Sequence, residues 1–359
     1  MTPLIGHRTG VGRFVEGLVA GLNPDTSVGI VPFAMTARGH SDVAPGQRFP
    51  LPARPARAVW ERFDRPSIER WTGPLDVVHG TNYVVPPARC ARLVSIHDLT
   101  AFRYPEMCTP NVQRMPVLLR RALKQGAHVH TDSQFVADEV CDLLHVEQVR
   151  VHAIGLGIPF DADRIARARQ APKPFGGRPY VLALGTVEPR KSLPILVSAF
   201  IELATKVADV SLVIAGADGW GSDALANVLG ELRADVRARI IRQLDVDNDY
   251  RDQLLVHCKL FVYPSLYEGF GFPPLEAMAA GRPVVATTAG SLPEVLGDAA
   301  VLVDPLSAEA LAAAMEQVLT NTELAASLVS RGAERVRRYR WDTMATSFAD
   351  LYRDLAENR

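Results

Sequence analysis

Short apolar runs alternate with longer amphipathic stretches along most of this 359-residue chain. In the longer stretches, apolar positions recur at three- and four-residue spacing, which predicts helices. The short runs are typical of buried strands and lie at residues 28–33, 76–80, 92–98, 128–133, 179–185, 210–216, 238–243, 259–265, 283–287 and 300–304. Such an alternation predicts an α/β fold with parallel sheets covered by helices on both faces.

The alternation breaks once, in a polar segment rich in Pro and Gly. Residues 164–179 carry no apolar period and are predicted to be a linker. We therefore expect a Rossmann-like domain over 1–163, a second over 180–340, and a C-terminal helix over 341–359 that crosses back to the first domain. The first strand is expected to be short or missing, because only the run TPLI lies between Met1 and the glycine at position 6.

Composition narrows the function classes. Hydrophobic residues make up 48% of the chain, charged residues 22%, and the net charge is -1, so no global electrostatic attraction to nucleic acid is expected. No apolar run approaches the roughly 18 residues that span a bilayer, and a cytoplasmic protein is expected. Lone cysteines without metal spacing argue against a zinc site or a disulfide scaffold; they are Cys90, Cys108, Cys141 and Cys258.

A pair of cations marks the first candidate site. Arg190 and Lys191 lie between a predicted strand and the start of a predicted helix. Cations at a helix N-terminus oppose the helix dipole, so a purely structural role is disfavoured, although a solvated turn stays an alternative. Together with free backbone N–H groups they suit a diphosphate.

A second segment repeats the order of strand, glycine loop and helix. Gly269 and Gly271 flank Phe270 and allow a close backbone approach to a ligand. Glu268 and Glu276 bracket this loop and the start of the following helix. Glu276 alone reads as a simple helix cap, but a pair of carboxylates around a glycine loop suits the hydroxyl groups of sugars and ribose.

These segments resemble a known family. GTVEPRKSLP (185–194), residues 267–304, SIHDLTAFRYPE (95–106) and RTGVGRF (8–14) are similar to retaining glycosyltransferases of the GT-B fold, in particular the family 4-like, mannosyltransferase-like members. The resemblance is strongest over residues 180–304. It implies two Rossmann-like domains whose parallel sheets face each other across a cleft, with the acceptor on the first domain and the nucleotide-sugar on the second.

The resemblance also implies roles for particular residues. Arg190 and Lys191 would neutralise the donor diphosphate and Glu276 would hold the ribose. Glu268 would hold the donor sugar, and the diphosphate would lie against the backbone of glycine-rich turns, namely Gly10, Gly12, Gly185, Gly269, Phe270 and Gly271.

His97 is the predicted catalytic residue of the first domain. It follows a buried strand, at the carboxyl edge where open α/β sheets bind ligands. The resemblance places it beside the transferred sugar, and a satisfied structural histidine is the alternative. Asp98 is expected to cap a helix or support His97.

The implied reaction transfers a hexose with retention of anomeric configuration and needs no metal or other cofactor. Mannose is the favoured sugar and GDP-mannose the favoured donor. Two fixed cations would stabilise the leaving nucleoside diphosphate. The alternating Asp245, Asp247 and Asp249 are interpreted as a polar loop that opens a helix, not as a metal site.

The acceptor, a glycan or lipid-linked glycan, is expected on the first domain. Residues 54–71 interleave arginines with Trp60, Phe63 and Trp71, and residues 115–125 add a second basic helix. Such stretches can rest on the anionic inner face of a membrane, or can simply be solvated helix faces. A nucleic-acid partner is not expected, since nothing else in the chain supports one.

Two other functions stay open. A nucleotide-sugar epimerase of the same fold would release the nucleotide without an acceptor. A non-catalytic sugar-nucleotide-binding subunit of a glycan-assembly complex would tolerate loss of Glu268 or Lys191. A nicotinamide dehydrogenase is disfavoured because no GxGxxG motif follows a strand.

Overall fold

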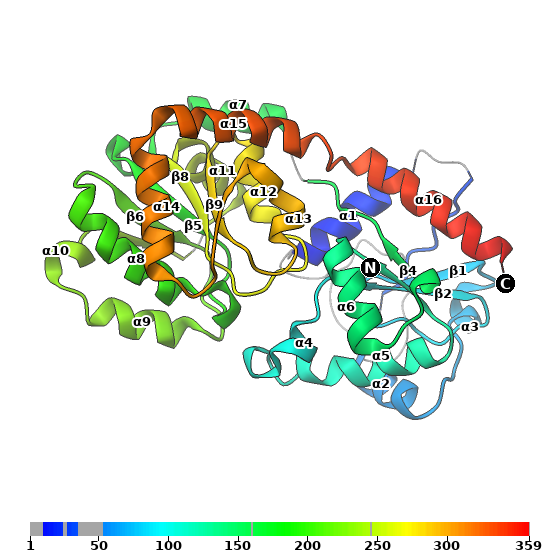
Figure 1. Cartoon of the computed structure of the whole chain (residues 1–359). Helices are drawn as coiled ribbons and strands as arrows, with labels where there is room; N and C mark the ends of the chain where they lie inside the picture. The colour runs from blue at the N-terminus through cyan, green and yellow to red at the C-terminus, as the bar shows by residue number, and fades with distance from the viewer. Residues whose placement is uncertain (1–9, 24–26, 35–52, 159–160, 245, 359) are drawn as a thin grey trace. The chain divides into compact units, whose positions relative to one another are not determined.

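The computed structural model describes residues 10–23, 27–34, 53–158, 161–244 and 246–358. The chain divides into two compact units. Unit 1 comprises residues 1–157 with 339–359, and unit 2 comprises residues 158–338. Each unit is described by itself (Figure 1). The expectation that the first strand is short or missing concerns the residues before Gly6, which lie outside the described residues.

Unit 1 is built on a four-stranded parallel sheet in the order β1-β2-β3-β4. Its strands are β1 (Val77–Gly80), β2 (Ala91–Ile96), β3 (His128–Thr131) and β4 (Val151–Ala153). In register, Ile96 of β2 lies beside Thr131 of β3. The residues that follow these two strands are therefore neighbours at one sheet edge.

The strand predicted at residues 28–33 is wrong. Residues 28–33 have no regular secondary structure, and the next residue, Ala34, forms an isolated β-bridge. Val31 is 41% exposed and Pro32 has no backbone N–H to donate, so the run neither buries a face nor completes a ladder. The prediction also missed β4, which has three residues and a polar centre, His152.

Helices of unit 1 pack around this sheet. They are α1 (Gly10–Leu22), α2 (Ala53–Arg62), α3 (Glu69–Thr72), α4 (Thr100–Arg103), α5 (Met115–Lys124), α6 (Gln134–Leu144) and α16 (Trp341–Glu357). Helix α16 packs against α1 and β1. A Cβ atom at Gly17 of α1 would lie 2.2 Å from the Trp341 ring, so glycine permits this close approach.

Unit 2 is built on a six-stranded parallel sheet in the order β10-β9-β8-β5-β6-β7. The strands are β5 (Tyr180–Leu184), β6 (Ser211–Ala215), β7 (Ile240–Gln243), β8 (Leu260–Tyr263), β9 (Val284–Thr287) and β10 (Val301–Val303), each within a predicted strand. Strands β5 and β8 are neighbours in the middle of the sheet. Their carboxyl ends open onto the same edge.

Helices cover both faces of the unit 2 sheet (Figure 1). They are α7 (Ala162–Gln170), α8 (Leu193–Lys206), α9 (Ser222–Gly230), α10 (Ala234–Arg237), α11 (Asn248–His257), α12 (Phe272–Ala279), α13 (Leu292–Leu296), α14 (Ala308–Thr320) and α15 (Thr322–Val336). Helices α8 and α14 pack together over one face, where Phe200 and Met315 are fully buried in the core. Helices α7, α11 and α12 lie together on the other face.

The segment predicted as a linker differs from the structure. Residues 162–170 form helix α7, which packs against α11 within unit 2, and the unit boundary falls between Gly157 and Ile158. Ile165 and Ala168 are buried at helical spacing, and the Asp161 carboxylate caps the helix. Arginines at the intervening positions conceal this narrow apolar face in the sequence.

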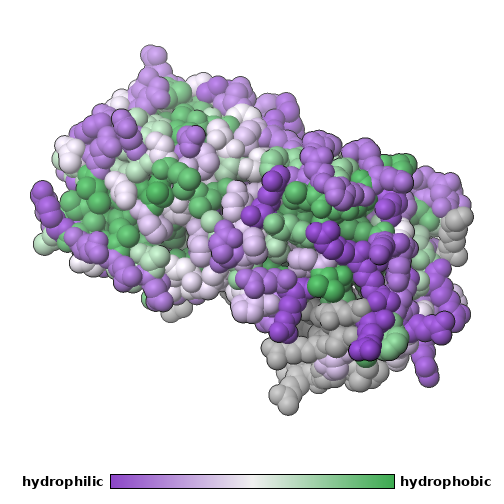
Figure 2. All heavy atoms as spheres, turned by 60° about the horizontal axis from the view of Figure 1, so that its bottom comes forward, coloured by the Kyte–Doolittle hydropathy of each residue, from purple (hydrophilic) through white to green (hydrophobic). Residues whose placement is uncertain are grey.

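The described surface mixes hydrophilic and hydrophobic residues on both units in the view of Figure 2. Among the described helices, none is long and apolar enough to cross a membrane. The four cysteines are unpaired with one another, and only Cys258 is fully buried.

Candidate functional site

The predicted cation pair lies at the carboxyl edge of the unit 2 sheet. After β5, Gly185 adopts φ +146°, a conformation that favours glycine, and the chain then forms a short 3₁₀ turn, η7 (Pro189–Lys191). Helix α8 begins at Leu193, so Arg190 and Lys191 stand just before its N-terminus, as predicted. The Leu266 N–H donates to the Arg190 carbonyl at 2.7 Å and ties this turn to the segment after β8.

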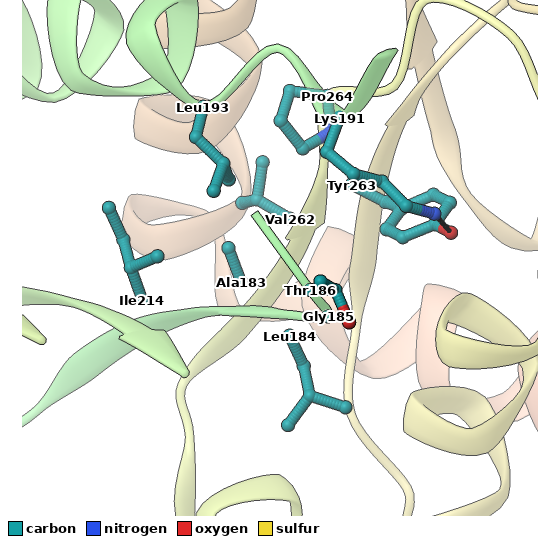
Figure 3. Close-up of a pocket in the computed structure, with 10 residues that line it drawn as sticks. All are labelled: Ala183, Leu184, Gly185, Thr186, Lys191, Leu193, Ile214, Val262, Tyr263 and Pro264. Carbon is teal, nitrogen blue, oxygen red and sulfur yellow. Dashed lines mark hydrogen bonds between the residues drawn. The ribbon is translucent and has the colours of Figure 1, made fainter. Parts of the chain in front are cut away.

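Glu268 joins the two cations. Its Oε1 atom lies 2.7 Å from Arg190 Nη1 and 2.6 Å from Lys191 Nζ. Arg190 also pairs with Glu188 at 3.0 Å, and Lys191 Nζ donates to the Tyr263 hydroxyl. Figure 3 shows Lys191 and Tyr263 side by side at a small hollow that Gly185 also lines. The cluster thus holds two cations and two carboxylates.

Burial and charge act in opposite directions on this cluster. Burial alone would raise the pKa of Glu268, but Arg190 and Lys191 outweigh it and lower that pKa to about 2. Burial, followed by the charge of Arg190, lowers the pKa of Lys191, and burial also raises the pKa of the Tyr263 hydroxyl. Glu268 is therefore an ionised carboxylate at any physiological pH.

The glycine loop follows Glu268 directly. Gly269, Phe270 and Gly271 are buried, and Gly271 adopts φ +96° immediately before α12. Prolines occupy the first turn of α12, where a missing N–H costs nothing. The Ser291 N–H donates to the Glu268 carbonyl at 2.9 Å, which fixes the loop against the segment before α13.

Glu276 lies in α12 and has a partner that the sequence did not reveal. Arg251 of α11 donates to its Oε2 atom, and both side chains are less than a tenth exposed. Arg251 also reaches Asp252, which pairs with Arg164 of α7. Glu268 and Glu276 therefore belong to two separate ion-pair groups within unit 2.

Asp247 opens helix α11, as the sequence predicts. The Asp247 carboxylate accepts the Tyr250 N–H at 2.8 Å and caps the helix. Asp245 lies outside the described residues. Within the described ranges, no three His, Cys, Asp or Glu side chains are grouped so that they could hold a metal ion.

His97 stands at the carboxyl edge of the unit 1 sheet, directly after β2, as predicted. Its Nδ1 atom lies 2.8 Å from Asp132 Oδ2, and its Nε2 atom lies 3.0 Å from the Thr81 carbonyl oxygen. The side chain is 11% exposed. Asp98 accepts the Thr100 N–H at 2.9 Å and the Tyr83 hydroxyl at 2.8 Å, but the N-cap residue of α4 is Leu99 and not the expected Asp98.

Gly10 and Gly12 are not in a free loop. Both lie in the first turn of α1, with Gly10 exposed and Gly12 buried. Phe14, Val15 and Leu18 form the buried face of that helix, and this apolar spacing extends the helix back to Gly10. The predicted glycine turn is thus the beginning of a helix, whose first N–H groups have no partner within the helix.

Several residues of these clusters were not predicted: Tyr263, Glu188, Arg251, Asp132 and Thr81, the last of which contributes its backbone carbonyl. Asp132 had a signal in the sequence, because it follows β3 as His97 follows β2, and neighbouring parallel strands end at the same edge. Arg251 had none, since nothing in its helix indicates contact with Glu276.

Comparisons with known proteins agree with this arrangement. A model of the family described as glycosyl transferases group 1 matches residues 165–335. O-antigen chain mannosyltransferase B of Escherichia coli is 30% identical over 287 residues, which are 77% of this chain and 74% of that protein. Serotype-specific mannosyltransferase WbdA of Escherichia coli is 29% identical over 262 residues, covering 69% of this chain and 32% of its own length.

Solved structures show the same fold. WaaG, a glycosyltransferase involved in lipopolysaccharide biosynthesis, superposes with a TM-score of 0.70 at 18% identity over 97% of both chains. The Anabaena protein HepE, solved with UDP and glucose, gives a TM-score of 0.64 at 21% identity over 78% of both chains. The fold is thus that of a GT-B glycosyltransferase. The chain belongs to the glycosyl transferases group 1 family, which confirms the resemblance seen in the sequence.

Proposed function

We propose that this glycosyltransferase transfers mannose, from GDP-mannose as the favoured donor, to a glycan or lipid-linked acceptor with retention of anomeric configuration and without a metal ion. The observation that carries the proposal is the cluster of Arg190, Lys191 and Glu268 at the carboxyl edge of the unit 2 sheet. Support for mannose comes from the mannosyltransferase names of the relatives above.

The cation pair supplies the site of the leaving group. A nucleoside diphosphate brings negative charge to Arg190 and Lys191, which are now neutralised by Glu188 and Glu268. When the phosphates pair with these cations, the Glu268 carboxylate becomes available to accept hydrogen bonds from the donor sugar. The same exchange applies at Glu276, where ribose hydroxyls replace Arg251 as hydrogen-bond donors.

The proposed reaction breaks the bond between the anomeric carbon and the phosphate oxygen. Its electron pair leaves on the diphosphate, where Arg190 and Lys191 stabilise the growing negative charge. The acceptor hydroxyl oxygen forms the new bond to the anomeric carbon on the face that the leaving group vacates, and its proton passes to the departing phosphate. No enzymatic base takes part.

Unit 1 offers a surface for a lipid-linked acceptor. Helices α2 and α5 pack together through Trp60 and Leu118, while Phe63 and Val117 are 59% and 58% exposed. Arg120 and Lys124 of α5 add positive charge. Apolar side chains beside basic ones suit contact with an anionic bilayer surface, and the view in Figure 2 shows hydrophobic patches next to hydrophilic ones on the described surface.

Ligand-induced stabilisation tests the donor site. A panel of GDP-, UDP-, dTDP- and ADP-sugars is added to the full chain and to Arg190→Ala and Glu276→Gln, and the melting temperature is measured. At a concentration of about 100 times Kd, a bound donor stabilises the native state by about 2.7 kcal/mol. We expect GDP-mannose to raise the melting temperature of the wild type and to leave both variants unchanged.

The matched control is Arg233→Ala, which removes an arginine that is 82% exposed and pairs with Asp235 on the surface of unit 2. It should respond to the donor like the wild type. Absence of a shift with every nucleotide-sugar contradicts the donor site. Nucleotide release in the absence of acceptor favours an epimerase instead, and transfer that stops on addition of EDTA refutes metal independence.

A further inference from the structure

Both ring nitrogens of His97 face hydrogen-bond acceptors. Nδ1 lies against the two carboxylate oxygens of Asp132, at 2.8 and 3.1 Å, and Nε2 lies 3.0 Å from the Thr81 carbonyl oxygen. An ionised carboxylate and a carbonyl oxygen can only accept hydrogen bonds, whereas a neutral imidazole carries only one N–H. Both contacts are hydrogen bonds only when the ring is doubly protonated and positively charged.

Two neighbouring histidines show the opposite pattern. The Tyr352 hydroxyl donates to His79 Nδ1 at 2.7 Å, and His79 Nε2 donates to Ser95 Oγ at 2.7 Å. The Ser95 hydroxyl donates to His130 Nδ1 at 2.9 Å, and His130 Nε2 donates to the Ile154 carbonyl at 3.1 Å. One proton on each ring is enough to satisfy all four contacts, so the neutral form of both rings fits this series of hydrogen bonds. Burial lowers the pKa of each to about 3, in agreement.

The surroundings of His97 favour its charge. Burial alone lowers its pKa, but the charge and hydrogen bond of Asp132 outweigh burial, and Asp98 adds a smaller effect, so that the pKa is raised above 6.5. Among the described residues, the other titratable groups near the ring are His79 and His130, whose pKa values burial lowers to about 3. From α1, Phe14 presents an apolar ring whose centroid lies 5.1 Å from that of His97.

We propose that Asp132 is a positioning residue that holds His97 as a doubly protonated imidazolium, so that unit 1 presents a fixed cation and an N–H donor, not a base. Nε2 donates to the Thr81 carbonyl, and an oxygen atom of a substrate bound to unit 1 can replace that carbonyl as the acceptor. The charge state of His97 is independent of the proposed function. Its consequence for transfer rests on that function.

Nuclear magnetic resonance titration of the full chain, labelled at histidine, tests the charge state directly. His97→Gln assigns the His97 ring signals among the nine histidines. We expect His97 to remain a charged ring at pH 7 in the wild type and to become neutral at that pH in Asp132→Asn. His79 and His130 should stay neutral throughout.

The control is Asp138→Asn, which makes the same carboxylate-to-amide change at an exposed position of α6 and should leave the His97 titration unchanged. If Asp132→Asn does not fold, the titration of the wild type alone tests whether His97 is charged. A wild-type His97 ring that is neutral at pH 7 overturns the proposal.

The pH profile of kcat and KM gives the second measurement. The active form is protonated, so activity falls as pH rises through the His97 pKa. Loss of Asp132 lowers that pKa and moves the fall in activity toward lower pH, so the variant loses activity at a pH where the wild type keeps it. Asp132→Glu, which keeps a carboxylate, should restore part of the lost activity. A charged His97 in a protein that binds no nucleotide-sugar would refute the proposed function and leave the His97 assignment standing.

Discussion

At the scale of single residues, the site of unit 2 is a set of charges buried against one another. Glu268, which is 6% exposed, neutralises Arg190 and Lys191 at the same oxygen atom. Removing one member of a buried ion pair leaves its partner uncompensated, and such a loss costs far more than the pair contributes against a neutral isostere. Glu268 therefore stabilises unit 2 when no ligand is bound.

Glu268→Gln tests this. We expect the free energy of unfolding in urea to fall by about 3 kcal/mol at neutral pH. Because the pKa of Glu268 is lowered from 4.5 to about 2 in the folded protein, its contribution is complete above about pH 4.5 and is lost as the pH falls toward 2. The wild type should lose more stability on acidification across that range than the variant.

A surface pair provides the comparison for this measurement. Glu202 lies one helical turn before Lys206 in α8, and both side chains are about 40% exposed. Glu202→Gln should cost less than about 0.5 kcal/mol at any pH. Equal effects of the two substitutions would mean that the Glu268 cluster is no more than a surface contact.

Site residues could be predicted where their position next to a strand or a helix marked them in the sequence. Arg190 and Lys191 were found because they stand between a strand and a helix, and His97 because it ends a strand. Arg251 was not found, because its contact with Glu276 joins α11 to α12 and depends on how two helices pack. Side-chain pairs of that kind leave no period or motif in the sequence.

At the scale of elements, buried parallel strands were the easiest part to predict. Strands β5, β6, β8 and β9 are mostly apolar runs between turn residues, the pattern typical of a strand that is buried on both faces. The hydrophobic pattern gave wrong predictions where an apolar segment is exposed or where a polar segment buries a narrow apolar face. Residues 28–33 are apolar but partly exposed, and α7 is rich in arginine yet buries Ile165 against unit 2.

Gly290→Ala tests whether the turn before α13 supports the glycine loop. Gly290 adopts φ +61°, and an added Cβ atom would lie 2.2 Å from the Glu268 carbonyl oxygen. We expect a loss of about 1 to 3 kcal/mol in unfolding free energy, because both the backbone conformation and the contact are strained. Affinity for the nucleotide-sugar should fall as well, since Glu268 must shift.

Gly230→Ala at the end of α9 is the matched substitution. A Cβ atom there meets nothing within 4 Å, so alanine should be neutral or stabilise by up to about 1 kcal/mol. If Gly290→Ala leaves stability and ligand affinity at wild-type values, the turn does not hold Glu268 in place.

At the scale of the whole molecule, each unit has its own parallel sheet, and the chain enters unit 2 at Ile158 and returns to unit 1 at Tyr339. Unit 1 is therefore assembled from two separate parts of the sequence. Helix α16 supplies the second part and contributes to its interior through Phe348, which is fully buried and lies 5.8 Å from Phe14 between ring centroids. Completion of unit 1 depends on residues that follow all of unit 2.

Deletion of α16 should unfold unit 1 selectively. Met344, Phe348, Leu351 and Leu355 are all buried, and each such side chain contributes about 1.5 to 3 kcal/mol, so their joint loss of roughly 6 to 12 kcal/mol rivals the whole stability of a domain. Limited proteolysis of a chain ending at Arg338 should degrade residues 1–157 and spare 158–338. The intact chain, digested in parallel, should resist cleavage in both units. Survival of residues 1–157 in the shortened chain would mean that the sheet of unit 1 closes its core without α16, and that α16 only covers a surface already folded.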